Sequence, residues 1–204
     1  FMNDGKILKD FYSSEDYGIV KAHFEEMGIP LFFLERLKPM FLTVFASGDV
    51  EFGGDLSGGS GMRSYEMELF DLCQESNKEV SGLETIEFQM SVFDSIPYQV
   101  QADMLLETIK SADVEDDSFK MMVDMYRNQD INKMVSSMAE DESIKAYESI
   151  LLDNRNSNWI PVMSDMMKQN SVFFAVGAGH LGGEKGVINL LKKAGYTLTP
   201  LSNS

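Results

Sequence analysis

The fold class rests on one stretch near the carboxyl end, SVFFAVGAGHLGGEKGVINLLKKAGYTLTPL, which covers residues 171–201. Its first six residues, Ser171–Val176, are β-prone and nearly all apolar, which is typical of a buried central strand. A glycine-rich turn (177–183) follows. The apolar stripe of the next segment predicts a helix that Gly195 ends, and Tyr196–Leu201 is predicted to be a last strand. The order strand, loop, helix, strand predicts a parallel, right-handed βαβ unit.

Most of the remaining chain shows helical periodicity. Ser13 is a good N-cap for an amphipathic stretch, and further helices are predicted at Phe32–Phe45 and Tyr65–Glu75. Glu79–Leu83 is predicted to be a short strand, and the region 85–170 is predicted to be largely helical. We therefore expect an α/β fold of the mixed α+β kind. A small central sheet, with the strand–loop–helix–strand unit at the C-terminal end, is flanked by a predominantly helical middle region.

The domain organisation is expected to be simple. Six glycines fall within residues 47–63, with little apolar periodicity, which predicts a flexible surface loop or a lid. The chain opens with Phe1-Met2-Asn3-Asp4, which does not resemble a natural start. We expect a single domain over residues 1–204 that is incomplete at its N-terminal end.

Composition excludes several classes of function. Seventeen basic and thirty-three acidic residues give a formal net charge of -16, which disfavours nucleic acid as a partner and attracts cations. The one cysteine rules out a cysteine-rich zinc cage. No apolar run is long enough for a transmembrane segment, and no signal peptide is visible.

The two histidines have different settings. His23 lies on the apolar face of its predicted helix and is expected to pack in the core. His180 lies just after a predicted buried strand and before a helix, where open α/β sheets place their ligand sites. Neutral imidazole is a common metal ligand. His180 is therefore the strongest single candidate for a functional residue.

The same loop also fits a dinucleotide fingerprint. Residues 177–182 match Gly-x-Gly-x-x-Gly between a predicted strand and a helix. That site needs an acidic residue about twenty positions further on, at the end of the next strand. Residues 199–204 contain no acid, so the nucleotide interpretation is disfavoured.

Four motifs in order resemble the TraB/GumN (Tiki-like) family. They read Ser64-Tyr65-Glu66; Val80-Ser81-Gly82-Leu83-Glu84-Thr85; Asp153-Asn154-Arg155-Asn156, followed by Trp159; and Phe173-Phe174-Ala175-Val176-Gly177-Ala178-Gly179-His180-Leu181 with the helix after it. The resemblance covers roughly residues 11–201. The family's first Gly-x-x-His element has no counterpart here, which implies a missing N-terminal segment of the same protein.

The resemblance implies a divalent-metal-dependent hydrolase that acts on peptides. His180 and Glu84 would be metal ligands, and Glu84 could instead be a general base acting on bound water. Arg155 would hold a carboxylate or a developing oxyanion, with Asn156 donating beside it. The plainer alternatives make Glu84 a helix-start acid, Arg155 a partner of a surface carboxylate, and Asn156 a solvated helix residue.

Manganese or cobalt is the expected metal, with zinc as the alternative, and a peptide or protein is the expected substrate. One histidine and one carboxylate are too few ligands for firm binding, so we expect this chain alone to be nearly inactive. The resemblance tilts the expected compartment toward the cell envelope or periplasm. The alternative function is a non-catalytic, helical binding protein of the same fold.

Overall fold

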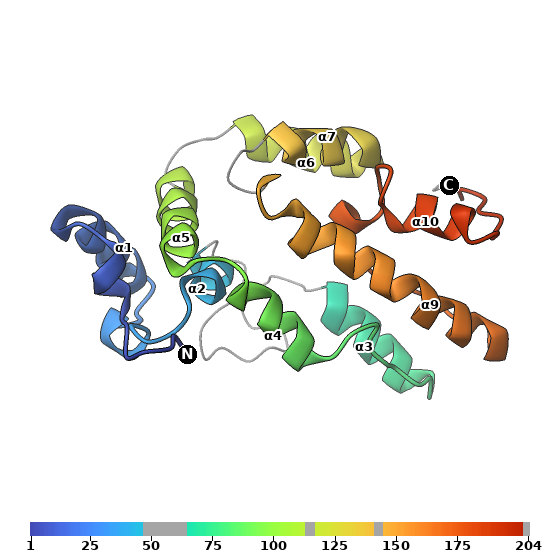
Figure 1. Cartoon of the computed structure of the whole chain (residues 1–204), viewed down its shortest axis with the longest axis horizontal. Coiled ribbons are helices and arrows are strands. Elements are labelled where there is room, and N and C mark those ends of the chain that lie inside the picture. Colours follow the sequence, from blue (N-terminus) through green and yellow to red (C-terminus); the bar gives the residue numbers. More distant parts are fainter. Residues whose placement is uncertain (47–64, 113–116, 141–144, 202–204) are drawn as a thin grey trace. The chain divides into compact units, whose positions relative to one another are not determined.

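The computed structural model describes residues 1–46, 65–112, 117–140 and 145–201. The chain divides into two compact units: Phe1–Gly82 with Ile96–Asp116 forms unit 1, and Leu83–Ser95 with Asp117–Ser204 forms unit 2. The glycine-rich loop predicted at residues 47–63 lies outside the described residues. Figure 1 shows the elements in order along the chain.

Unit 1 is helical in its described part. Its elements are η1 (Leu8–Phe11), α1 (Ser14–Glu26), η2 (Leu31–Phe33), α2 (Pro39–Ala46), α3 (Tyr65–Glu75) and α5 (Tyr98–Ala112). The core of the unit is aliphatic and aromatic, and its most buried members include Leu8, Val20, Phe24, Leu31, Leu34, Leu42 and Leu105. His23 is half-buried, and its Nε2 lies 3.0 Å from the carbonyl oxygen of Ala46.

Local sequence explains how α1 begins and ends. The Ser13 hydroxyl accepts a hydrogen bond from the backbone N–H of Asp16 at 3.1 Å, which caps the first turn. At the other end, Gly28 has a φ of +77°, and the Ile29 N–H reaches back to the Phe24 carbonyl at 2.9 Å. Glycine tolerates this left-handed conformation, so the helix stops here.

Unit 2 is also helical in its described part. Its elements are α4 (Ile86–Asp94), α6 (Asp117–Arg127), α7 (Ile131–Glu140), the π-helical turn η3 (Ser149–Asp153), α9 (Asn154–Gln169), the 3-10 turn η4 (Ala178–His180) and α10 (Val187–Lys193). α9 packs against α10, and η4 packs against both α7 and η3. The core cluster consists of Trp159, Met163 and Val187, with partly buried apolar side chains around them.

The predicted α/β fold class is wrong, because the described residues form helices, turns and irregular segments and contain no strand. Ser171–Val176 has no strand partner among the residues that the structure describes. Phe174 and Val176 pack against the α9 core cluster, whereas Phe173 is 80% exposed and Val172 is 39% exposed. A β-strand is defined by backbone hydrogen bonds to a neighbour. The segment's apolar composition predicted burial on both faces, but only one side is packed.

The two other predicted strands are also wrong, because neither segment forms a strand in the structure. Glu79–Leu83 is an irregular, largely exposed connection, and Tyr196–Leu201 follows α10 without entering a ladder. The predicted βαβ unit is therefore an extended segment, the turn η4, the helix α10 and a second irregular segment. None of the helices in the described part of the chain is both long and apolar enough to cross a bilayer.

Candidate functional site

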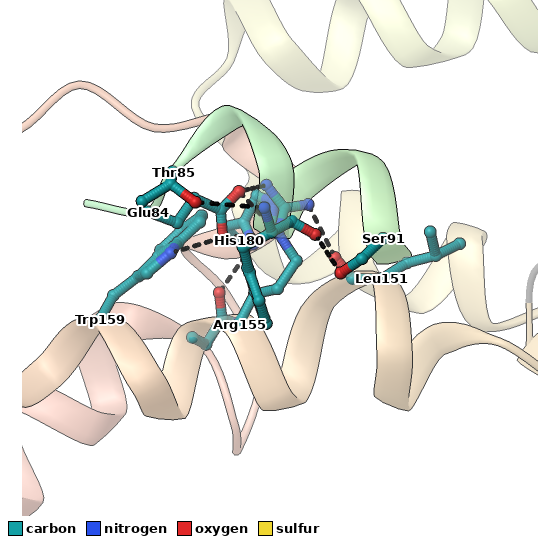
Figure 2. A network of polar contacts seen from close by, with 9 residues as sticks. Glu84, Thr85, Ser91, Leu151, Arg155, Trp159 and His180 are labelled. Carbon is teal, nitrogen blue, oxygen red and sulfur yellow. Dashed lines mark hydrogen bonds and ion pairs between the residues drawn. The ribbon is translucent and has the colours of Figure 1, made fainter. Parts of the chain in front are cut away.

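One face of α9 carries the side chains of a polar cluster within unit 2. Asn156 and Trp159 are buried and three residues apart. Arg155 lies four residues before Trp159, so the two are neighbours on the helix surface. The chain enters α9 directly from the π-helical turn η3, and such turns are frequent at functional sites. Figure 2 shows Arg155 and Trp159 beside Glu84 and His180.

Glu84 is the residue immediately before Thr85, the N-cap of α4. The Thr85 hydroxyl accepts the backbone N–H of Phe88 at 3.1 Å, so Thr85, and not Glu84, caps the helix. The Glu84 carboxylate instead binds Arg155, whose Nε lies 3.1 and 3.2 Å from the two oxygens and whose Nη2 lies 2.6 Å from Oε1. Nη1 of the same guanidinium donates to the Leu151 carbonyl at 3.0 Å.

The Glu84–Arg155 pair is shielded from water and has a third member. The side chains of Arg155 and Glu84 are 14% and 13% exposed. Trp159 Nε1 donates to Glu84 Oε2 at 3.0 Å, and the Arg155 guanidinium lies 5.2 Å from the centre of the Trp159 ring. Both carboxylate oxygens therefore accept from protein donors. Removing either member of a pair buried in this way leaves an uncompensated charge.

His180 is positioned by an amide. Its Nδ1 lies 2.7 Å from Asn156 Oδ1, while Asn156 Nδ2 donates to the Lys185 carbonyl at 3.0 Å. A carbonyl oxygen can only accept, so the Lys185 contact fixes which end of the Asn156 amide faces His180. The acceptor Oδ1 faces the ring, and Nδ1 must carry the hydrogen. In the neutral imidazole the lone pair is then on Nε2.

His180 stays neutral at physiological pH. Burial is the main reason that the pKa of His180 is lowered to about 4, the Arg155 charge lowers it further, and the Glu84 charge partly opposes this. The Trp159 ring lies against the imidazole, with centroids 4.5 Å apart and planes inclined by 44°. The arrangement thus holds an uncharged imidazole with its lone pair on Nε2, which is the form in which histidine binds metal ions.

The loop after His180 depends on two glycines. A Cβ atom at Gly186 would collide with the carbonyl oxygens of Gly182 and Leu181, and one at Gly182 would lie 2.7 Å from the Ile131 carbonyl oxygen. Both positions therefore exclude larger residues. A hollow of about 210 Å³ lies beside this loop, with Asn156 in its wall. Its other lining residues are Val135, Glu148, Leu152, Asp153, Gly179, Gly182, Gly183, Glu184, Lys185 and Gly186.

The two predicted metal ligands differ in how well they fit a metal ion. His180 fits, because Nε2 carries the lone pair and Nδ1 is held by a hydrogen bond, as is usual for metal-binding imidazoles. Glu84 does not fit, because two donors already occupy its oxygens. Among the described residues, no three His, Cys, Asp or Glu side chains come close enough to form a metal-binding group.

The structure brings all four sequence-predicted site residues into unit 2, and it assigns partners to each. Glu84 binds Arg155, and Asn156 binds His180. Arg155 pairs with a buried carboxylate rather than a surface one, and Asn156 is 2% exposed rather than solvated. Trp159 was not predicted as part of the site. The sequence did contain a signal for it, because Trp159 is three residues after Asn156 and four after Arg155, and residues at these spacings are neighbours on a helix.

The comparison with family models identifies the chain. The model of the TraB/PrgY/gumN family matches residues 1–200, so the protein belongs to this family. The suspected resemblance is thereby confirmed. Searches of curated proteins and of solved structures gave no match.

Proposed function

We propose that this protein is a divalent-metal-dependent hydrolase of peptides and that His180 supplies one metal ligand through Nε2. The observation that carries the proposal is the fixed, neutral His180, with its hydrogen on Nδ1 and its lone pair on Nε2. A bound metal ion would act as a Lewis acid and lower the pKa of a water molecule. The remaining ligands are residues other than Glu84, and we assign the protein to the cell envelope as part of the proposal.

The chain's own residues have narrower roles in this proposal. Asn156 holds the imidazole and sets its tautomer. Arg155 is held by Glu84 and by the Leu151 carbonyl, so its charge faces the imidazole and favours the neutral form. The Glu84 carboxylate braces Arg155 and is neither a metal ligand nor a free general base. Tight bracing of this kind keeps a reactive group within the narrow geometry that chemistry requires.

A second candidate function is a non-catalytic binding protein with the same fold. The saturated Glu84 carboxylate favours it, because a buried, fully paired carboxylate stabilises a structure without taking part in chemistry. The two candidates differ in one measurable property, which is metal binding that depends on His180.

The test is a calorimetric titration with manganese, cobalt and zinc ions. The wild type is compared with His180→Ala, with His23→Ala as the matched control and with Glu84→Gln. We expect one binding event that is lost in His180→Ala, kept in His23→Ala, and changed less than threefold in Glu84→Gln. Where the remaining metal ligands are supplied, metal-dependent cleavage of a mixed peptide pool, read by mass spectrometry, should be lost in His180→Ala and kept in His23→Ala.

Two results would count against this assignment. Binding that survives in His180→Ala would place the metal elsewhere, and absence of any His180-dependent binding would leave the binding protein as the better account. Loss of binding in a folded Glu84→Gln variant would restore Glu84 as a ligand. Circular dichroism of each variant separates these results from misfolding.

A further inference from the structure

Trp159 connects the Glu84 carboxylate to His180. Its indole Nε1 donates to Glu84 Oε2 at 3.0 Å, and its ring lies 4.5 Å from the imidazole, centroid to centroid. We infer that Trp159 is a positioning residue for His180 and that Glu84 acts on the imidazole through the indole. The inference deepens the proposed function, because it rests on His180 as the reactive group.

The imidazole needs a second restraint besides Asn156. The hydrogen bond to Asn156 restrains one atom, Nδ1, but a single hydrogen bond tolerates tilting of the ring through small rotations about the Cα–Cβ and Cβ–Cγ bonds. The Trp159 ring, inclined by 44° to the imidazole, contacts the ring itself and limits this rotation. Together the two contacts fix where the Nε2 lone pair points. Such supporting contacts decide whether a site is held within its productive geometry.

Trp159 is itself restrained by two polar neighbours. Glu84 accepts its N–H, and the Arg155 guanidinium lies 5.2 Å from its ring centre. The indole is 5% exposed, so it has little room to move. Because Glu84 also binds Arg155 through two nitrogens, the carboxylate locks the position of the indole. A change at Glu84 is therefore transmitted to His180.

The test reads the imidazole directly in the metal-free protein. Long-range proton–nitrogen NMR spectra at pH 7 distinguish a protonated ring nitrogen from one with a lone pair. His180 and His23 are the two histidines in the chain, so His23 is an internal reference. The variants are Trp159→Leu, which removes the ring, and Trp159→Phe, which keeps a ring without the N–H. Met163→Ala is the matched control, because Met163 is equally buried on α9 in the same cluster.

We expect widely separated Nδ1 and Nε2 signals for His180 in the wild type and in Met163→Ala. In Trp159→Leu the two signals should move toward each other, because a less restrained imidazole leaves the Asn156 hydrogen bond for part of the time and then samples both tautomers. Trp159→Phe should retain most of the separation. An unchanged pattern in folded Trp159→Leu, or the same collapse in Met163→Ala, would overturn the inference. If Trp159→Leu fails to fold, the decision rests on the Glu84 cycle described next.

A double-mutant cycle tests the path from Glu84. Glu84→Ala, which removes the acceptor of the indole N–H, should weaken the His180 signal separation in the wild-type background. It should add nothing further in the Trp159→Phe background, which lacks the indole N–H. Equal effects in both backgrounds would show that Glu84 acts by another route. These spectra need neither metal nor substrate, so this inference can fail while the metal titration succeeds, and the reverse.

Discussion

At the scale of single residues, one amide determines the state of the candidate site. Asn156 donates to the Lys185 carbonyl and accepts from His180, so its orientation is not free. The neighbouring Arg155 charge and the burial of the ring both favour the uncharged imidazole. A histidine placed in this way costs stability whenever it must be protonated.

The pH dependence of unfolding follows from this cost. The pKa of His180 is about 4 in the folded chain and near the ordinary 6.5 when unfolded. Between these values the unfolded state binds the extra proton, so stability is full above pH 6.5 and is lost as the pH falls toward 4. The loss amounts to at most about 3 kcal/mol. Chemical denaturation at pH 7 and pH 4.5 should therefore show a smaller loss in His180→Gln than in the wild type.

The control for this comparison is His23→Gln, which removes the other imidazole of the chain, so a smaller loss in His180→Gln than in His23→Gln assigns the effect to His180. Carboxylates contribute equally to all three proteins and cancel in the differences. Equal losses in His180→Gln and the wild type would mean that His180 is solvated and ordinary.

The chemistry of the site residues was predictable from sequence, but their partners were not. Residue type and motif order singled out Glu84 and His180. The partners of the Glu84 carboxylate come from α9, which packs beside the start of α4. Glu84 and Arg155 are seventy-one residues apart in the sequence. A local sequence pattern cannot predict a contact between residues so far apart in the sequence. The motif that contains Thr85 did not indicate that Thr85 caps α4. Because Thr85 is the cap, the Glu84 carboxylate is left to contact α9.

At the scale of elements, local signals predicted most helices well and strands badly. The helix predicted at Phe32–Phe45 is divided into η2 and α2, which begins only at Pro39. Ser13 caps α1 as its sequence predicts, and the helix predicted at Tyr65–Glu75 has those bounds. A helix closes its hydrogen bonds within itself, so nearby residues determine it. A strand needs a neighbour that its own sequence does not specify. Ser171–Val176 has the composition of a strand and the alternation of one packed side, but no partner in the described residues.

Substitution of two adjacent phenylalanines tests whether Ser171–Val176 is packed on one side only. Phe173 is 80% exposed, whereas Phe174 packs against the α9 core cluster. Phe173→Ser should change the free energy of unfolding by less than about 0.5 kcal/mol, as expected for an exposed position. Phe174→Ser should cost clearly more, about 1–3 kcal/mol. Both values come from chemical denaturation at neutral pH.

The buried-strand interpretation makes the opposite forecast for the first variant. A phenylalanine in a fully buried central strand costs about 3–5 kcal/mol when truncated. A loss of that size in Phe173→Ser, comparable with the loss in Phe174→Ser, would restore a two-sided packing of this segment.

At the scale of the whole molecule, the candidate site belongs to one unit, while the family pattern covers both. Glu84, Arg155, Asn156, Trp159 and His180 all lie in unit 2. The family match over residues 1–200 includes unit 1 as well. The single domain expected from the sequence stays a prediction. The described hydrogen bonds of the site join residues of unit 2 to one another.

The net charge of -16 is a property of the entire chain, and it predicts how salt acts on stability. Unbalanced negative charge repels itself in the compact state. Sodium chloride shortens the Debye length from about 30 Å at 0.01 M to about 8 Å at 0.15 M, which screens this repulsion. The melting temperature at pH 7 should therefore rise over this range, measured by circular dichroism.

The described ion pairs stabilise the fold, so salt weakens them and lowers the melting temperature. This effect is smaller than the screening of the net repulsion. Pairs such as Lys21–Glu25 and Lys168–Asp165 are more than half exposed, so each contributes little to stability, and salt reduces that contribution. At a pH near 4.4, the isoelectric point of the sequence, the excess charge vanishes and only these attractions remain. The effect of sodium chloride should then shrink or reverse its sign. A melting temperature that falls with salt at pH 7 would mean that local pairs outweigh the net repulsion.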